Sequence, residues 1–182
     1  MRRKRLVLAI AALVGVVVQG KMSACAQEAP FGLHWGLVLE VPRPSSAERD
    51  ANITRLIYQE GRQPAELNGT EAVMLEVCAR EGLQHVVWFS SPLSDSAAVA
   101  QYRAAMAEGT RRYGEPMPDA AGAGVTWPEG RTKLKWERDQ AGKVHLVMVS
   151  YGPDFEACSE QHRSLTGHPA TEHASYTIIK PK

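Results

Sequence analysis

Two histidines stand where a side chain could take part in acid–base chemistry. His85 and His145 each fall within an apolar segment that is typical of a β-strand, and pairing of the two strands would bring the rings face to face. Such a pair fits a small hydrolase in which one ring acts as a general base. The other interpretation is a histidine hydrogen-bonded in the core, because spacing ties no acid, nucleophile or oxyanion-binding group to either. We therefore predict no catalytic residue.

Three further histidines, His162, His168 and His173, lie near the C-terminus with glutamates beside them. Their spacings of six and five residues match neither one face of a helix nor a zinc motif, so solvent-exposed rings are the simpler interpretation. No serine stands in a G-x-S-x-G motif, and Gly122–Gly124 lacks the lysine of a phosphate-binding loop. The sequence therefore predicts neither a metal site nor a cofactor.

The N-terminus has the features of an export signal. Arg2–Arg5 form a basic stretch before an apolar run, Leu6–Val18, which is shorter than the roughly 20 residues that span a bilayer. Ala24-Cys25-Ala26 matches an A-x-A cleavage site, which predicts a signal peptide over residues 1–26 and a periplasmic or secreted chain beginning at Gln27. One alternative is a retained membrane anchor. The other is a lipoprotein anchored through Cys25, because Met22–Cys25 resembles a lipobox.

Removal of this leader changes the net charge. Five of the 21 Lys and Arg residues lie in the leader, which leaves 16 against 20 Asp and Glu, or about −4. A negative chain argues against nucleic acid or anionic lipid as the main partner. We expect a protein or a component of the cell envelope as the partner, and no membrane span after processing. Residues 27–182 are long enough for a single domain with its own core.

Cleavage also removes Cys25 and leaves Cys78 and Cys158. Two cysteines in an exported domain usually pair, so we predict a disulfide between them. The closed loop holds 81 residues counting both cysteines, for which the chain-entropy model gives about 4.5 kcal/mol of stabilisation. The alternative is two free, buried thiols.

Four tryptophans, Trp35, Trp88, Trp127 and Trp136, are candidates for contacts with a partner. Partly exposed tryptophans anchor many binding surfaces. We place a possible binding surface at Trp88 and Trp127. Packing in the core is the other use of such large side chains.

A helix over Ser94–Tyr113 would be the central element. Ser94 or Asp95 is a suitable N-cap, and Gly114 with Pro116 ends the helix. Its apolar stripe recurs every three or four positions, at Val99, Tyr102, Met106, Thr110 and Tyr113. Alternating residues predict strands around it at Phe31–Trp35, Ile53–Gln59, Ala72–Cys78, Leu83–Phe89, where Leu83, Val87 and Phe89 share a face, and Thr132–Glu137. Lys143–Tyr151 is apolar on both faces, which predicts a central strand, and we expect an edge strand at Ala174–Lys180. We expect a loop or a short helical turn at Ser45–Ala51, a mobile loop at Met117–Gly130, and one or two helical turns at Phe155–Arg163. The predicted fold is α+β: an antiparallel sheet of five to six strands with one main helix on one face.

Two short motifs support this fold. Phe31-Gly-Leu-His-Trp-Gly36 resembles the F-G-L-x-W-G opening of several small exported bacterial domains of unknown function. Tyr113-Gly-Glu-Pro116 is similar to the Y-G-x-P end of a helix in those domains, where a loop with a tryptophan and a pair of strands follow, as Trp127 and Arg131–Tyr151 do here. The resemblance implies a periplasmic α+β module and brings no activity or catalytic residue. We expect a non-catalytic binding or accessory module, with a hydrolase that uses His85 or His145 as the alternative.

Overall fold

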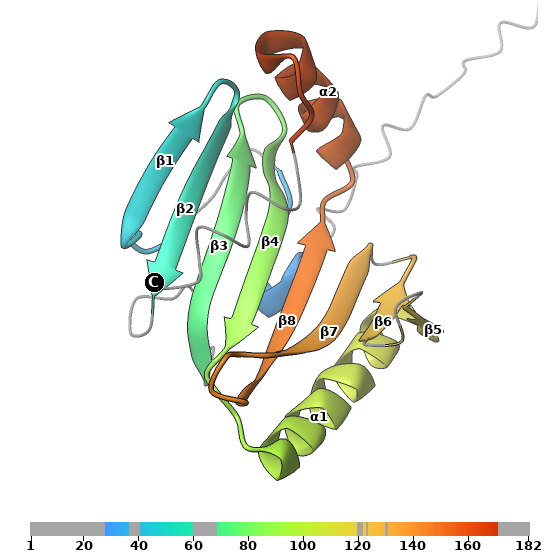
Figure 1. Ribbon diagram of the computed structural model, residues 1–182. Helices are drawn as coiled ribbons and strands as arrows, with labels where there is room; N and C mark the ends of the chain where they lie inside the picture. Colours follow the sequence, from blue (N-terminus) through green and yellow to red (C-terminus); the bar gives the residue numbers. More distant parts are fainter. Residues whose placement is uncertain are drawn as a thin grey trace, which may run out of the picture.

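The computed structural model describes residues 28–36, 41–59, 69–119, 122, 124–129 and 131–170. These residues form one antiparallel sheet of eight strands with two α-helices (Figure 1). The elements, in chain order, are a 3-10 turn at Pro30–Gly32, β1 Ser46–Asp50, β2 Ile53–Gln59, β3 Thr70–Cys78, β4 Gly82–Ser90, α1 Asp95–Tyr113, β5 Met117–Pro118, β6 Gly124–Trp127, β7 Thr132–Arg138, β8 Val144–Tyr151 and α2 Phe155–Thr166. The predicted signal peptide, Cys25, His173 and the predicted strand Ala174–Lys180 lie outside the described residues.

The strand order is β1-β2-β3-β4-β8-β7-β6-β5. Each half of the chain forms a meander of four consecutive strands, and β4 and β8 join the two meanders side by side. The predicted class, an α+β fold with an antiparallel sheet, is confirmed. The predicted number of strands was too low at five to six, and the structure has a second helix, α2. Within the described residues, neither helix is long and apolar enough to cross a membrane.

The two faces of the sheet carry separate apolar clusters, because successive side chains of a strand point to opposite faces. We call the face covered by α1 the helix face. Its cluster includes Tyr58, Val73, Leu75, Val86, Trp88, Trp127, Leu134 and Leu146, against which Tyr102 and Met106 of α1 pack. The 3-10 turn and the residues after it lie on the same face, where Leu33 and Trp35 are buried. The predicted stripe of α1 is thus correct for Tyr102 and Met106, whereas Val99 is 45% exposed.

The opposite face, which we call the second face, is also apolar. Its cluster comprises Ile57, Ala72, Met74, Val87, Phe89, Val147, Val149 and Tyr151. Strands β3, β4 and β8 therefore bury both of their faces, as expected for the centre of a sheet.

Local chemistry sets the ends of α1 as the sequence predicts. The hydroxyl of Ser94 accepts a hydrogen bond from the Ala97 amide, and Gly114 follows the last turn with a φ of 82°. Glu108 is ion-paired with Arg111 and Arg112 one turn further on. Hydrogen bonds from these two guanidinium groups lower the pKa of Glu108 to about 2.

Three segments differ from the prediction. Residues 46–50, expected as a loop or helical turn, form the edge strand β1, which pairs with β2 through its backbone. Phe31–Trp35 is not a strand, because Phe31 takes a positive φ of 61° inside the 3-10 turn. Met117–Gly130, expected as a mobile loop, contains β5 and β6, which extend the sheet beyond β7.

Candidate functional site

The predicted disulfide between Cys78 and Cys158 is present, with 6.1 Å between the Cα atoms. It joins the last residue of β3 to α2, so that two segments 80 residues apart are tied at one end of the sheet. Both cysteines are buried. The carboxylate of Glu81 lies within 4.8 Å of the two sulfur atoms, but sulfurs bonded to each other do not ligate a metal as thiolates do.

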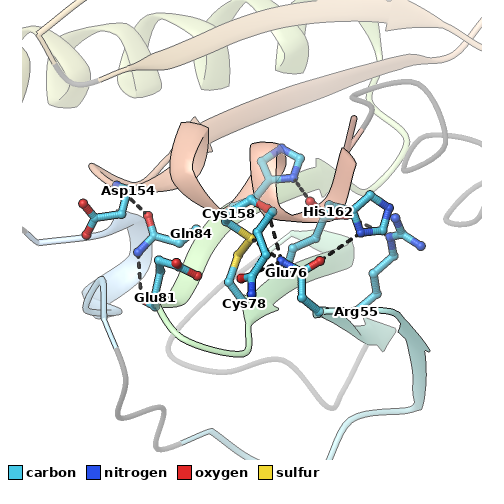
Figure 2. Close-up of a disulfide and its surroundings, with 11 residues drawn as sticks. Arg55, Glu76, Cys78, Glu81, Gln84, Asp154, Cys158 and His162 are labelled. Carbon is cyan, nitrogen blue, oxygen red and sulfur yellow. Dashed lines mark hydrogen bonds and ion pairs between the residues drawn. A yellow bond between two sulfur atoms is a disulfide. The ribbon is translucent and has the colours of Figure 1, made fainter. Parts of the chain in front are cut away.

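Buried polar side chains attach α2 to the sheet beside this disulfide. The amide nitrogen of Asn52 donates to the carbonyl of Cys158 at 3.1 Å, and its oxygen lies 3.1 Å from Nδ1 of His162. At the other end of the helix, Gln84 accepts a hydrogen bond from the backbone of Asp154 at 3.0 Å. Figure 2 shows Gln84 and Asp154 on one side of the disulfide and His162 on the other.

A buried group of three polar side chains, centred on the carboxylate of Glu76, lies next to the disulfide. Arg55 on β2 donates from Nε to Oε1 of Glu76 on β3 at 2.9 Å. The other oxygen of Glu76 is 2.6 Å from Nδ1 of His85 on β4. All three residues are under 10% exposed, and Figure 2 shows Arg55 and Glu76 beside the cysteines. We call Arg55, Glu76 and His85 the charged triad.

The electrostatics of the triad define which atoms carry protons. Burial alone would raise the pKa of Glu76, and it is the largest single influence. The hydrogen bonds and charges of His85 and Arg55 together outweigh burial and lower the pKa of Glu76 below its ordinary value. Glu76 is therefore an ionised acceptor, and Nδ1 of His85 must be the donor in their contact.

A carboxylate that holds Nδ1 of a histidine is the arrangement that orients a general base. Here, however, the imidazole is stacked on Tyr151, with ring centres 4.7 Å apart, and Phe155 lies 5.5 Å away. The other ring nitrogen, Nε2, is buried without a hydrogen-bond partner in the structure as described, so no hydroxyl or thiol stands next to it. The triad orients His85 without giving it a reaction partner, and its evident effect is to join three strands.

The second predicted histidine lies elsewhere. His145 is at the start of β8, where Nδ1 is 3.2 Å from Glu71 and Nε2 is 3.4 Å from Asp139. The strands of His85 and His145 do pair, but their register places Tyr151 opposite His85. The two rings are thus separated by six residues of strand, or about 20 Å, and the expected face-to-face pair is wrong. His34 is exposed at the N-terminal bridge to Glu28.

Of the C-terminal histidines, His162 is not solvent-exposed as expected. It is 1% exposed within α2 and bonded to Asn52, because the disulfide holds this face of the helix against β2 and β3. His168 is exposed, with its ring centre 5.7 Å from that of His162. The sequence signal that identifies His162 as buried is its spacing of four residues from Cys158.

The predicted binding surface at Trp88 and Trp127 is wrong, because both residues are core residues. Trp88 is 6% exposed and donates from Nε1 to the Thr70 hydroxyl at 2.7 Å. Trp127 is 1% exposed and lies flat against Gly109 of α1, where a Cβ atom would stand 2.4 Å from Cζ2 of the indole. Packing in the core, the other use we considered for these side chains, is what the structure shows.

Among the described residues, the tryptophan that is exposed is Trp136 on β7, at 46%. It lies opposite Leu146 of β8, while the described part of β6 ends opposite Lys135. The outer side of Trp136 therefore has no strand partner among the described residues. A separate hollow of about 550 Å³ lies at the end of α1, lined by Arg112, Tyr113, Gly114, Glu115 and Glu129.

Comparison with protein-family models, with curated proteins and with solved structures finds no match for this chain.

Proposed function

We propose that the chain is an exported, non-catalytic binding or accessory module that acts on a protein or a component of the cell envelope, in an inhibitory, immunity-type or assembly role. The predicted leader supports export, and the Cys78–Cys158 disulfide is compatible with an oxidising compartment. The negative charge expected for residues 27–182 favours a partner other than nucleic acid.

The observation that carries this proposal is the exposure of Trp136. A tryptophan that is half exposed on a strand presents a large apolar surface and, with only two side-chain torsions, loses little conformational entropy on binding. On the same side of β7 as Trp136, the exposed side chain of Arg138 is ion-paired with Asp95 of α1 at 2.9 Å. An aromatic anchor beside charged side chains is the usual composition of a binding surface with a polar rim.

The test is affinity capture with a matched pair of variants. The exported chain, immobilised, is exposed to a cell-envelope extract as wild type, as Trp136→Ala and as Leu165→Ala. Leu165 is the control, because it is a large apolar residue that is 61% exposed on α2, away from β7. Loss of a central aromatic anchor costs about 2 kcal/mol or more of affinity, so Trp136→Ala should lose the captured component that Leu165→Ala retains. Equal capture by both variants would contradict the proposed surface.

A small hydrolase that uses His85 is the second candidate. The observation that favours it is the 2.6 Å contact between Glu76 and His85, which fixes the imidazole as an oriented base. This candidate requires α2 to move, because Phe155 and Tyr151 pack on the ring. Biological activity that is lost in a normally folded His85→Ala variant, and retained in Trp136→Ala, would favour the hydrolase over the binding module.

A further inference from the structure

A group of potential metal ligands surrounds the disulfide. Cys78 and Cys158 offer sulfur, Glu81 offers a carboxylate oxygen, and the three ligand atoms all lie within 4.8 Å of one another. Figure 2 shows the carboxyl group of Glu81 beside the sulfur–sulfur bond. While the two sulfurs are bonded to each other, they cannot bind a metal as thiolates. Reduction converts the same group into two thiols and a carboxylate.

The side chain of Glu81 lacks a partner at this place. Its Oε2 atom is buried and has no hydrogen-bond partner among the described residues, although the side chain as a whole is only half-buried. A buried carboxylate oxygen without a donor is costly, and a cation beside it offsets that cost. The neighbouring atoms that can share a cation with Glu81 are the two sulfurs.

Hydrogen bonds that do not involve the sulfur–sulfur bond direct these ligands to one place. Cys78 is the last residue of β3, and Glu81 follows it in the turn before β4. Gln84 donates to the carbonyl of Glu81 at 2.8 Å. It also accepts at 3.0 Å from the backbone of Asp154, at the start of the helix that carries Cys158. The turn and the helix are thus connected beside the ligands by contacts other than the disulfide.

Asn52 adds a contact that favours a thiolate. Its Nδ2 atom lies 3.7 Å from Sγ of Cys158 and donates to the carbonyl of the same residue at 3.1 Å. An N–H donor stabilises the charged form of its acceptor, and the thiolate is the form of cysteine that binds a metal. Asn52 therefore supports the charge that Cys158 carries as a ligand.

We propose that the reduced chain binds one borderline-soft divalent cation, of which Zn²⁺ is the best fit, through Cys78, Glu81 and Cys158. Two thiolates and a carboxylate suit Zn²⁺, and three protein ligands leave the fourth tetrahedral position to water. Ligand atoms about 2.0–2.3 Å from one ion lie roughly 3.5–4 Å apart, so the sulfurs separate while the carboxylate stays near its present distance. This inference does not depend on Trp136 or on the partner proposed above.

The site forms in two balanced steps. A dithiol reductant closes to its own disulfide, and its two electrons and two protons convert the Cys78–Cys158 bond into two thiols. The cation then displaces both thiol protons, which leave to solvent, and binds the two thiolates with the carboxylate of Glu81. In the reduced chain the cation links β3 to α2 in place of the covalent bond. Metal binding at this end of the sheet is therefore controlled by the redox state of the chain.

Cobalt binding tests the site directly. The exported chain is reduced with a phosphine, freed of excess reductant and titrated with Co²⁺, whose thiolate charge-transfer band appears only when sulfur binds the metal. We expect a single Co²⁺ per reduced chain, no band from the oxidised chain, and loss of the band when Zn²⁺ displaces Co²⁺. Glu81→Gln should weaken binding about tenfold or more, whereas Glu115→Gln, which changes an exposed carboxylate after α1, should bind like wild type. Absence of the band from the reduced chain overturns the proposal, as does equal affinity of Glu81→Gln and wild type.

A stability measurement applies if the reduced chain does not fold without metal. Unfolded thiols also bind metals, so the deciding readout is stabilisation of the folded chain. Zn²⁺ should give the reduced chain the circular dichroism spectrum of the oxidised chain and raise its thermal unfolding midpoint. It should do neither for Cys78→Ser. Failure of Zn²⁺ to stabilise the reduced chain, or equal stabilisation of Cys78→Ser, overturns the proposal.

Discussion

Glu76 and His85 lie directly opposite each other in β3 and β4, with 2.6 Å between Oε2 and Nδ1. Both are almost fully buried, at 3% and 1% exposure. A buried carboxylate is costly unless its oxygens are paired, so each member of the charged triad keeps the others stable. The arrangement therefore predicts large effects from removing one member.

His85→Ala should lower the free energy of unfolding by about 3 kcal/mol, because one oxygen of Glu76 would stay buried without its donor. His145→Ala should lower the free energy of unfolding less, by about 1 kcal/mol, because the contacts of His145 with Glu71 and Asp139 lie near the surface. Urea unfolding of both variants measures the difference. In a complementation assay at low temperature, both should keep biological activity in proportion to the folded fraction. A folded but inactive His85→Ala variant would support the hydrolase instead.

Glu76 also predicts a dependence of stability on pH. Its pKa is lowered in the folded chain from an ordinary value of 4.5, so the unfolded chain takes up a proton more readily. The contribution of Glu76 is fully present above about pH 5 and is lost as pH falls through the lower, folded pKa. Glu76→Gln should be less stable than wild type at pH 7, and the difference should shrink towards pH 3. Denaturant unfolding at several pH values checks this, and a difference that grows in acid would contradict it.

Reduction of the Cys78–Cys158 disulfide should destabilise the chain by up to about 4.5 kcal/mol. Thermal unfolding with and without a phosphine reductant measures this, and Cys78→Ser should match the reduced wild type. The loss of the disulfide should also expose His162 and Cys158 to solvent, because this bond attaches α2 to the sheet. Free thiols found in the oxidised protein by peptide mapping would show that the bond does not form.

Gly109→Ala should destabilise the chain although alanine is the better helix former. The added Cβ would stand 2.4 Å from Cζ2 of Trp127, so the indole or the helix must shift. Overpacking costs about 1–3 kcal/mol, and contacts with three indole atoms below 3.0 Å place this site at the upper end, above the gain in propensity of about 1 kcal/mol. Ala107→Gly at an exposed position of α1 is the control, and it should change stability without changing the near-ultraviolet spectrum of the tryptophans. A more stable Gly109→Ala variant would contradict the packing.

The strands that the sequence predicts are those with an apolar alternation. β2, β3, β4, β7 and β8 all bury at least one face, so periodicity identifies them. β1 has no such signal, because its residues are mostly exposed. It is held in the sheet by the pairing of its backbone with that of β2, which no side-chain pattern reveals. The alternation correctly indicates that Leu33 and Trp35 are buried. It does not reveal the positive φ of Phe31, which prevents this segment from forming a strand.

The charged triad could not be predicted from spacing, because its register depends on a β-bulge. Between Glu76 and Val77 the pairing of β3 with β4 shifts by one residue, at Gln84. Without this extra residue, Gln84 would lie opposite Glu76 and His85 would point to the helix face. The bulge also places Leu83 on the helix face, opposite to the side that carries Val87 and Phe89, with which the prediction had grouped it. Gln84 itself is left to hydrogen-bond Glu81 and Asp154.

The two meanders meet at β4 and β8, and the chain passes between them through α1 and the exposed residues Gly114 and Glu115. Cys78 belongs to the first meander, whereas Cys158 follows the second. A protease that cuts once after α1 would thus produce two fragments that remain a single covalent molecule. Each fragment carries a complete four-stranded ribbon, so the chain is suited to fragment complementation, in which oxidation locks the reassembled halves and reduction releases them.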